Sequence, residues 1–318
     1  MTKSENKKDW WRVLKKGDLV DVVSPASSIT KNELAKIKLF LEENGLRARF
    51  YLDHELLLTK KQSHNFSSFL AKKRFEQLHF ALTNKESQAI WCVRGGYGSA
   101  DLIALLQETK KIAQTKLFIG FSDITSLGIF LQQKWNWKII YGPMLNQLAF
   151  DKVTAQSKKS ILDFIFGKKI ELKYRLEVKN SAKKIEGEVV GGCLSVIASQ
   201  FATSNQLDFE NKILFLEDID ESGEKIDRYF CQFVQNMLRA KSYPSAILLG
   251  NYCFGMTIKK KQNVALAIKK LSERLQENKI DIAVFEEKTK CLGHAKNMMP
   301  LVIGARAIIV ENSLVQSF

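Results

Sequence analysis

The sequence predicts an α/β protein with a parallel sheet in its first half and a second α/β domain behind it. Short β-rich runs alternate with helical patterns over the first half, which is typical of βαβ units. The alternation begins again after about Glu186. A chain of 318 residues, 45% of them hydrophobic, is long enough to form two domains with their own cores.

The first half is expected to open with a buried strand and an amphipathic helix. The strand covers Leu19 to Ser24. Thr30 and Glu33 have the spacing of a capping box at the start of the helix, and Asn44-Gly45 is a typical helix end. The next expected elements are one helix and three strands: Phe66–Leu82, Ala89–Val93, Lys116–Phe121 and Lys138–Tyr141.

The second half is expected to follow a connecting segment. Residues 151–185 are interpreted as a helix plus a Lys-rich connector, which divides the chain into 1–150, 151–185 and 186–318. Four strands are expected after it: Ile213–Leu216, Ala246–Leu249, Ile280–Phe285 and Leu301–Val310. Three helices are expected between them, at about Leu194–Phe201, Lys225–Leu238 and Asn263–Gln276.

The net charge of +15 raises the question of an anionic partner. Nucleic acid or a membrane surface would favour such a charge if the basic residues gathered on one element. Lys-Lys pairs instead recur along the whole chain, so we interpret the charge as ordinary surface charge. We therefore expect neither nucleic acid nor a membrane as a partner.

A cytoplasmic location is expected from the N-terminus and the cysteines. The segment Met1 to Asp18 is charged and has no apolar signal core, and the longest apolar stretches are too short to span a bilayer. The five cysteines are odd in number and scattered, with no CxxC pair. This pattern favours reduced thiols over a disulfide framework or a zinc site, and we expect no metal or cofactor.

Ser122 lies at the expected corner between a strand and a helix. The apolar run Leu117 to Phe121 leads into Ser122, and Asp123 to Thr125 is a typical helix opening. A sharp turn of this kind exposes the corner residue and directs the first helical N–H groups towards whatever it attacks. Ile124 stands where the G-x-S-x-G pattern has its second glycine. By spacing alone, a plain helix N-cap remains the alternative role for Ser122.

A glycine-rich turn, Arg94-Gly95-Gly96-Tyr97-Gly98, is the second candidate feature. It lies between an expected strand and helix, where exposed backbone N–H groups can bind an oxyanion or a phosphate. It matches neither the Walker pattern nor G-x-G-x-x-G. A tight turn that only needs positive φ is the alternative.

The chain has four histidines, so the candidates for a general base are few. His79 is expected on a helix, and His54 and His64 lie in a polar stretch. His294 follows Gly293 in a loop between two expected strands, where its ring can reach a cleft. It is the best candidate for a base.

Glu217 and Asp218 are the candidate carboxylates to hold that histidine. Both follow the buried run Ile213 to Leu216. Side chains alternate along a strand, so the two carboxylates point to opposite faces, and only one of them can face His294.

Together these segments resemble the LD-carboxypeptidase family, the muramoyltetrapeptide carboxypeptidases, which also includes the microcin C immunity hydrolases. The resemblance runs from about Lys16 to Val310. The motifs that carry it occur in one order: Gly17-Asp18, Val23-Ser24-Pro25, Ile90 to Ser99, Gly120 to Thr125, Gly142-Pro143-Met144, Gly191-Gly192 with Leu194-Ser195, Leu216-Glu217-Asp218, Ile226-Asp227-Arg228, Gly293-His294, Pro300 and Ile303 to Arg306.

The resemblance implies a Ser-Glu-His triad of Ser122, Glu217 and His294. It also implies an oxyanion hole made by the backbone N–H groups of Gly96 and Asp123. The implied fold is a flavodoxin-like N-terminal domain, akin to class I amidotransferases, with a C-terminal swivelling β/α domain, commonly as a homodimer. The implied substrate is the cytoplasmic murein tetrapeptide, from which a terminal D-alanine is released during cell-wall recycling.

The substrate preference is less well defined by the sequence. Arg94 and Arg228 are candidates for a carboxylate clamp. The chain departs from the usual family pattern at four places: Tyr141, where histidine often stands, Cys193 for asparagine, Asp101 for arginine, and the loop Ala295 to Met299. Two alternatives therefore stay open: a hydrolase of peptidyl or aminoacyl nucleotides on the same scaffold, and a basic nucleic-acid-binding protein with a vestigial triad.

Overall fold

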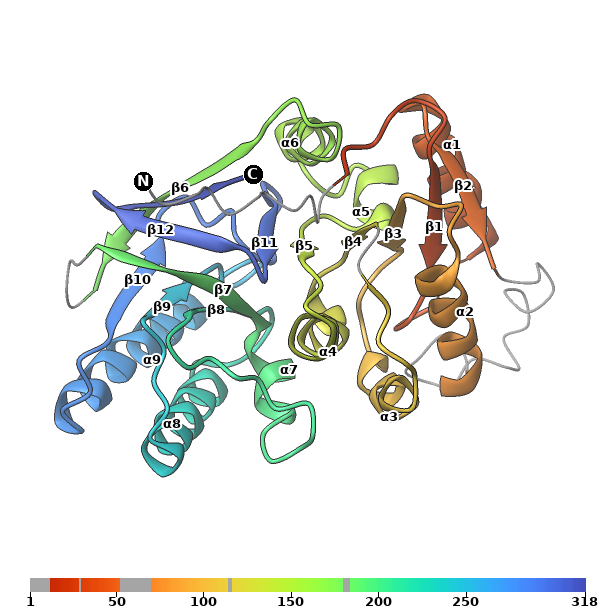
Figure 1. Ribbon diagram of the computed structural model, residues 1–318. Helices are drawn as coiled ribbons and strands as arrows, with labels where there is room; N and C mark the ends of the chain where they lie inside the picture. Colours follow the sequence, from red (N-terminus) through yellow and green to blue (C-terminus); the bar gives the residue numbers. More distant parts are fainter. Residues whose placement is uncertain (1–11, 29, 52–69, 114–115, 180–183) are drawn as a thin grey trace, which may run out of the picture.

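The computed structural model describes residues 12–28, 30–51, 70–113, 116–179 and 184–318. The described chain is a mixed α/β structure in which a six-stranded, mostly parallel sheet lies beside a closed barrel (Figure 1). The start of the helix expected from Phe66, together with His54 and His64, lies outside the described residues. Within the described ranges, no helix combines the length and the apolar character needed to cross a membrane.

The six-stranded sheet has the order β11-β5-β4-β3-β1-β2. Its strands are β1 (Leu19–Val23), β2 (Arg47–Phe50), β3 (Ala89–Cys92), β4 (Leu117–Ile119), β5 (Ile139–Tyr141) and β11 (Leu301–Ile303). All neighbours are parallel except β11, which pairs antiparallel with β5. The central strands β3, β4 and β5 are fully buried, because helices cover both faces of the sheet (Figure 1).

The helices of this part are α1 (Lys31–Glu43), α2 (Ala71–Thr83), α3 (Ile103–Gln107), α4 (Thr125–Trp135), α5 (Leu145–Ala149) and α6 (Ala155–Ile165). The predicted capping box of α1 is confirmed: the Thr30 hydroxyl accepts from the Glu33 N–H, and the Glu33 carboxylate accepts from the Thr30 N–H. Asn44 is the C-cap, as predicted. The four strands predicted in the first half are likewise confirmed, within two residues at each end.

The barrel has the order β10-β6-β13-β12-β7-β8-β9. Its strands are β6 (Glu171–Val178), β7 (Ile185–Cys193), β8 (Ile213–Glu217), β9 (Ala246–Leu249), β10 (Ala283–Glu287), β12 (Arg306–Val310) and β13 (Ser313–Ser317). Strands β7 to β10 run parallel, and the other pairs are antiparallel. The helices α7 (Leu194–Ser199), α8 (Gly223–Ala240) and α9 (Ile258–Glu277) confirm the three predicted in this half, and α8 and α9 lie outside the barrel (Figure 1).

The predicted Lys-rich connector is wrong over residues 171–178. This segment is strand β6, in which Leu172, Tyr174 and Leu176 are buried while their neighbours face solvent. Charged residues fill the outward positions, so apolar and polar side chains alternate with the period of two of a strand that has one buried face. The richness in lysine favoured the interpretation as a connector, although this alternation is present in the sequence.

The single strand predicted over Leu301–Val310 is also wrong, because two strands lie there. Gly304, with φ +84°, breaks the run. Residues before it pair with β5 in the first sheet, and residues after it pair with β7 in the barrel. Only glycine adopts this conformation easily, so the apolar run changes sheets at that point. Strand β11 therefore ties the C-terminal part of the chain to the edge of the first sheet.

Candidate active site

Ser122 lies where strand β4 turns into the 3₁₀ turn η2 (Ser122–Ile124) and helix α4. Its backbone has φ 64°, the left-handed region that a serine rarely adopts. Such a conformation costs about 1–3 kcal/mol and is concentrated at functional sites. The strained corner presents the hydroxyl at the carboxyl end of the sheet, with the N-terminus of α4 behind it.

His294 reaches this hydroxyl from the loop between β10 and β11. Its Nε2 lies 3.0 Å from the Ser122 Oγ. The imidazole packs on the ring of Phe121, with ring centroids 4.8 Å apart, and is only 11% exposed. The serine and the histidine therefore meet across the junction between sheet and barrel, although 172 positions separate them in the sequence.

Glu217 holds the other side of the imidazole. It is the last residue of β8 and is fully buried. Its Oε2 lies 2.8 Å from His294 Nδ1 and also accepts the backbone N–H of His294 at 2.8 Å. Gly293, with φ +94°, makes this approach possible, because a Cβ there would lie 2.3 Å from the same carboxylate oxygen.

Asp218 points away from the histidine, as the alternation along the strand predicts. Its carboxylate accepts from the backbone N–H groups of Ser195 at 2.7 Å and Ile219 at 2.8 Å. Burial, followed by the neighbouring charge of Glu217, raises the pKa of Asp218 to about 6. The Asp218 carboxylate therefore binds backbone N–H groups at the end of β8 and the start of α7, and it does not contact the imidazole.

The pKa of His294 depends on opposing effects. Burial lowers the pKa, but the negative charge of Glu217 and the hydrogen bond to it outweigh burial, and Asp218 and Asp220 act in the same direction. The pKa of His294 therefore lies above its ordinary value of 6.5. A base of this strength suits proton transfer from a hydroxyl near neutral pH.

The glycine-rich turn packs directly against the serine. A Cβ on Gly95 would lie 3.1 Å from Ser122 Oγ and 3.4 Å from the Asp123 backbone nitrogen. Gly96 has φ +116°, and a Cβ there would lie 2.0 Å from the Ser27 hydroxyl oxygen. The backbone of this turn thus approaches the hydroxyl at a distance that side chains would prevent.

A buried arginine holds the glycine-rich turn through hydrogen bonds to backbone carbonyls. Arg74 of α2 is 1% exposed and donates to the carbonyls of Pro25 at 2.7 Å and Gly98 at 2.5 Å. It also forms an ion pair with Asp101 at 2.7 Å. Asp101 is one of the departures from the family pattern, whereas the sequence gives no sign of the role of Arg74, because an arginine in an amphipathic helix is ordinarily a surface residue.

The two predicted clamp residues are placed differently. Arg94 precedes the glycine-rich turn and donates to the Ser28 carbonyl at 3.4 Å. Arg228 is an exposed residue of α8. The structure thus brings Ser122, His294 and Glu217 into hydrogen-bonding contact. Gly95 packs against Ser122 and the Asp123 nitrogen, and Gly96 lies against Ser27. A substrate-binding role for the two arginines stays a prediction.

Comparisons with known proteins agree with this geometry. Residues 20–142 match the model of the LD-carboxypeptidase N-terminal domain, and residues 186–309 match that of the LD-carboxypeptidase C-terminal domain. The chain belongs to the LD-carboxypeptidase family. This membership assigns it to a family of peptidases.

Three relatives of this LD-carboxypeptidase family member have names that state a substrate or a biological role. A protein named a probable murein peptide carboxypeptidase from Bacillus subtilis is 33% identical over 70% of this chain and 68% of its own length. The murein tetrapeptide carboxypeptidase of Pseudomonas aeruginosa is 26% identical, over 74% and 75%. The microcin C7 self-immunity protein MccF of Escherichia coli is also 26% identical, over 74% and 76%.

The fold of the LD-carboxypeptidase family is found in solved structures. The crystal structure of muramoyltetrapeptide carboxypeptidase from Oxalobacter formigenes superposes with a TM-score of 0.75 at 22% identity, covering 94% of this chain and 99% of that one. The mixed α/β architecture of the two bodies is therefore that of this family.

Proposed function

We propose that this chain is a serine carboxypeptidase that hydrolyses an LD-peptide bond. It releases the terminal D-alanine of murein tetrapeptide during cell-wall recycling. The observation that carries the proposal is the hydrogen-bonded series from Ser122 through His294 to Glu217, with separations of 3.0 and 2.8 Å, in a chain of the LD-carboxypeptidase family.

In the first step, the Ser122 Oγ attacks the carbonyl carbon at the L-configured centre. Its proton passes to His294 Nε2, and Glu217 stabilises the imidazolium through Nδ1. His294 then gives that proton to the departing amine, and D-alanine leaves. The peptide remains as an ester on Ser122.

In the second step, water replaces the amine. His294 takes a proton from the water as the water oxygen attacks the ester carbonyl, and the proton returns to Ser122 as the tripeptide leaves. In both steps we propose that the Gly96 and Asp123 N–H groups donate to the developing oxyanion. The packing of Gly95, the neighbour of Gly96, on Ser122 and on the Asp123 nitrogen supports this assignment.

The test is release of D-alanine from murein tetrapeptide by the purified protein. We expect equimolar tripeptide and D-alanine, measured by mass spectrometry and by a chiral amino-acid assay. The matched substrate control ends in L-alanine and should be cleaved far more slowly. Absence of any D-alanine at high enzyme concentration would contradict the proposal.

The pH dependence of the reaction is a further prediction. His294 must be neutral to accept the serine proton, and its pKa lies above 6.5. We therefore expect kcat/KM to fall on the acid side with a midpoint above pH 6.5, because protonation removes the base. A profile of kcat/KM from pH 5 to about pH 9 measures this midpoint; a flat profile down to the low end would show that His294 is not the base.

A second candidate function is hydrolysis of a peptidyl or aminoacyl nucleotide. The similarity to MccF favours it. One substrate for the comparison is an aminoacyl adenylate analogue whose phosphate linkage is stable but whose aminoacyl bond can still be cleaved. The ratio of its kcat/KM to that of the tetrapeptide decides between the two functions. We expect the tetrapeptide to be preferred.

Three further properties are proposed with this function. The strand order β2-β1-β3-β4-β5 is that of flavodoxin-like sheets, which supports a flavodoxin-like, amidotransferase-like N-terminal domain over 1–150. The connector predicted over 151–185 is proposed only for its part before β6, because β6 is a strand of the barrel. A swivelling C-terminal domain over 186–318 completes the proposed division. We also propose a homodimer in the cytoplasm, where the peptides of cell-wall recycling are found.

A further inference from the structure

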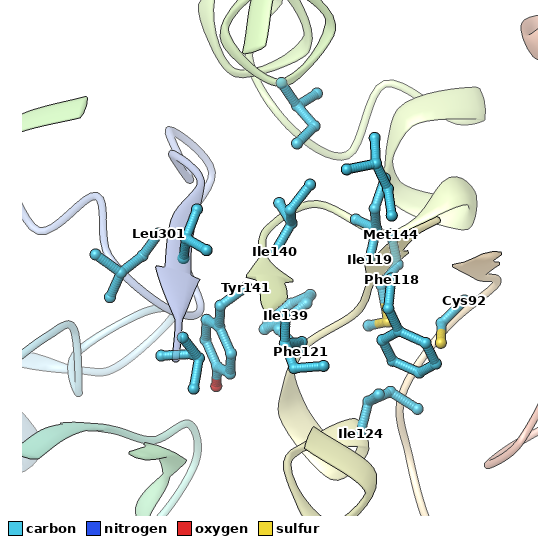
Figure 2. Packing of buried hydrophobic residues seen from close by; sticks show 14 of the residues in the cluster. Cys92, Phe118, Ile119, Phe121, Ile124, Ile139, Ile140, Tyr141, Met144 and Leu301 are labelled. Atoms are coloured by element: carbon cyan, nitrogen blue, oxygen red, sulfur yellow. The ribbon is translucent and has the colours of Figure 1, made fainter. Parts of the chain in front are cut away.

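The Tyr141 hydroxyl connects the two halves of the site. Tyr141 ends β5 and is 2% exposed. Its hydroxyl donates to Glu217 Oε1 at 2.5 Å and accepts from the Ser122 backbone N–H at 3.4 Å. Figure 2 shows its ring between β5 and β11, with the oxygen at the edge of the apolar cluster. One hydroxyl thus bridges the strained serine corner of the sheet and the carboxylate of the barrel.

The ring that carries this hydroxyl is held from several sides. Phe121 and Phe215 pack edge-on against it, with centroids 5.7 and 5.5 Å away. Gly192, with φ +146°, lies against the ring edge, since a Cβ there would be 2.9 Å from Tyr141 Cε2. Aromatic contacts of this geometry add to the burial of the ring and limit its movement. The hydroxyl therefore has a fixed direction.

We propose that Tyr141 is a positioning residue that orients Glu217 and moderates the negative charge acting on His294. This inference rests on the roles proposed above for Ser122, Glu217 and His294. Burial raises the pKa of Tyr141 well above its usual range, and Glu217 and Cys193 raise it further, so the hydroxyl stays protonated and remains a donor. With Oε1 held by Tyr141, Oε2 is left for the two N–H groups of His294.

The charge on Glu217 is shared between these donors. A hydroxyl that donates to the carboxylate withdraws part of its charge from the imidazole. The other groups that act on the His294 proton are Asp218 and Asp220, both of which favour the imidazolium. Loss of the Tyr141 hydroxyl leaves more negative charge facing His294, so its protonation becomes easier.

The Tyr141→Phe variant tests this directly. We expect kcat to fall about tenfold to a hundredfold, as for loss of a hydrogen bond to a charged group, with KM little changed because Tyr141 is buried. We also expect the acid limb of kcat/KM to move to higher pH by roughly half a unit. The same acid-side pH dependence is also measured for the rate at which a fluorophosphonate modifies Ser122. This second measurement needs no peptide substrate.

Tyr174→Phe is the matched control. Tyr174 is also buried, and its hydroxyl donates to the Pro300 carbonyl, away from the triad. This variant should lose thermal stability without moving the acid limb. Should Tyr141→Phe fail to fold, 3-fluorotyrosine at position 141 provides the opposite test. Its more acidic hydroxyl is a stronger donor, its fluorine can sit on the ring edge away from Gly192, and the acid limb should move to lower pH.

The outcomes separate this inference from the proposed function. A limb that moves in Tyr141→Phe but not in Tyr174→Phe supports the positioning role. A uniform loss of rate in Tyr141→Phe with an unchanged limb, in a variant whose circular dichroism is native, overturns the role and leaves the proposed function standing. A wild-type protein that neither reacts with the fluorophosphonate at Ser122 nor releases D-alanine overturns both.

Discussion

The Ser122→Ala variant is expected to lose at least about 10⁴-fold in kcat for D-alanine release, because no other group can form the ester intermediate. Alanine keeps the Cβ that the corner already accommodates at φ 64°, so the fold should be retained. Release of D-alanine is measured together with intact mass after fluorophosphonate treatment. The wild type should gain one phosphonyl group, and the variant none.

Ser126→Ala is the control for this experiment. Ser126 lies one turn further along, in α4, and is fully buried. Among the residues that the structure describes, its hydroxyl oxygen has no hydrogen-bond partner, so its removal breaks no bond. Ser126→Ala should therefore cleave the tetrapeptide at the wild-type rate. If Ser122→Ala cleaved it at more than about a hundredth of that rate, a serine nucleophile at this position would be refuted.

Local signals were sufficient to predict most of the first sheet. The capping box of Thr30 and Glu33, the buried runs of β3 and β4, and the glycine-rich turn all depend on neighbours in the sequence. The sequence could not reveal the barrel in the same way. Closure of the barrel requires β6 to pair with β13, for example Tyr174 with Leu314. The residues around Tyr174 in the sequence do not indicate a strand partner so far along the chain.

The candidate site was predicted in part for a similar reason. Alternation along β8 indicated that Glu217 and Asp218 face opposite ways, but not which of them meets the histidine. The family resemblance implied that Glu217 is the partner of His294, and the structure places its carboxylate against His294 Nδ1. The positions of Tyr141 and Arg74 escaped prediction, because their polar atoms become important only where separate segments are packed together.

The Glu217→Gln variant has the second-largest expected effect, and the structure predicts its size. The oxygen that faces His294 Nδ1 also accepts the backbone N–H of His294. An amide NH₂ cannot accept that N–H, so the glutamine should turn its oxygen towards His294 and its NH₂ towards Tyr141, whose oxygen can accept it. The tautomer with a proton on Nδ1 is then preserved. Only the charge that stabilises the imidazolium is lost, at a cost of about 10²–10³-fold in kcat.

The pH profile and a neighbouring variant check this interpretation. Removal of the Glu217 charge should lower the pKa of His294, so the acid limb of kcat/KM should move to lower pH, opposite to the shift expected for Tyr141→Phe. Asp218→Asn, on the other face of the same strand end, should cause a much smaller loss. A loss near 10⁴-fold in Glu217→Gln would instead indicate the reversed amide, which donates to Nδ1 and places the proton on Nε2, where it blocks proton transfer from Ser122.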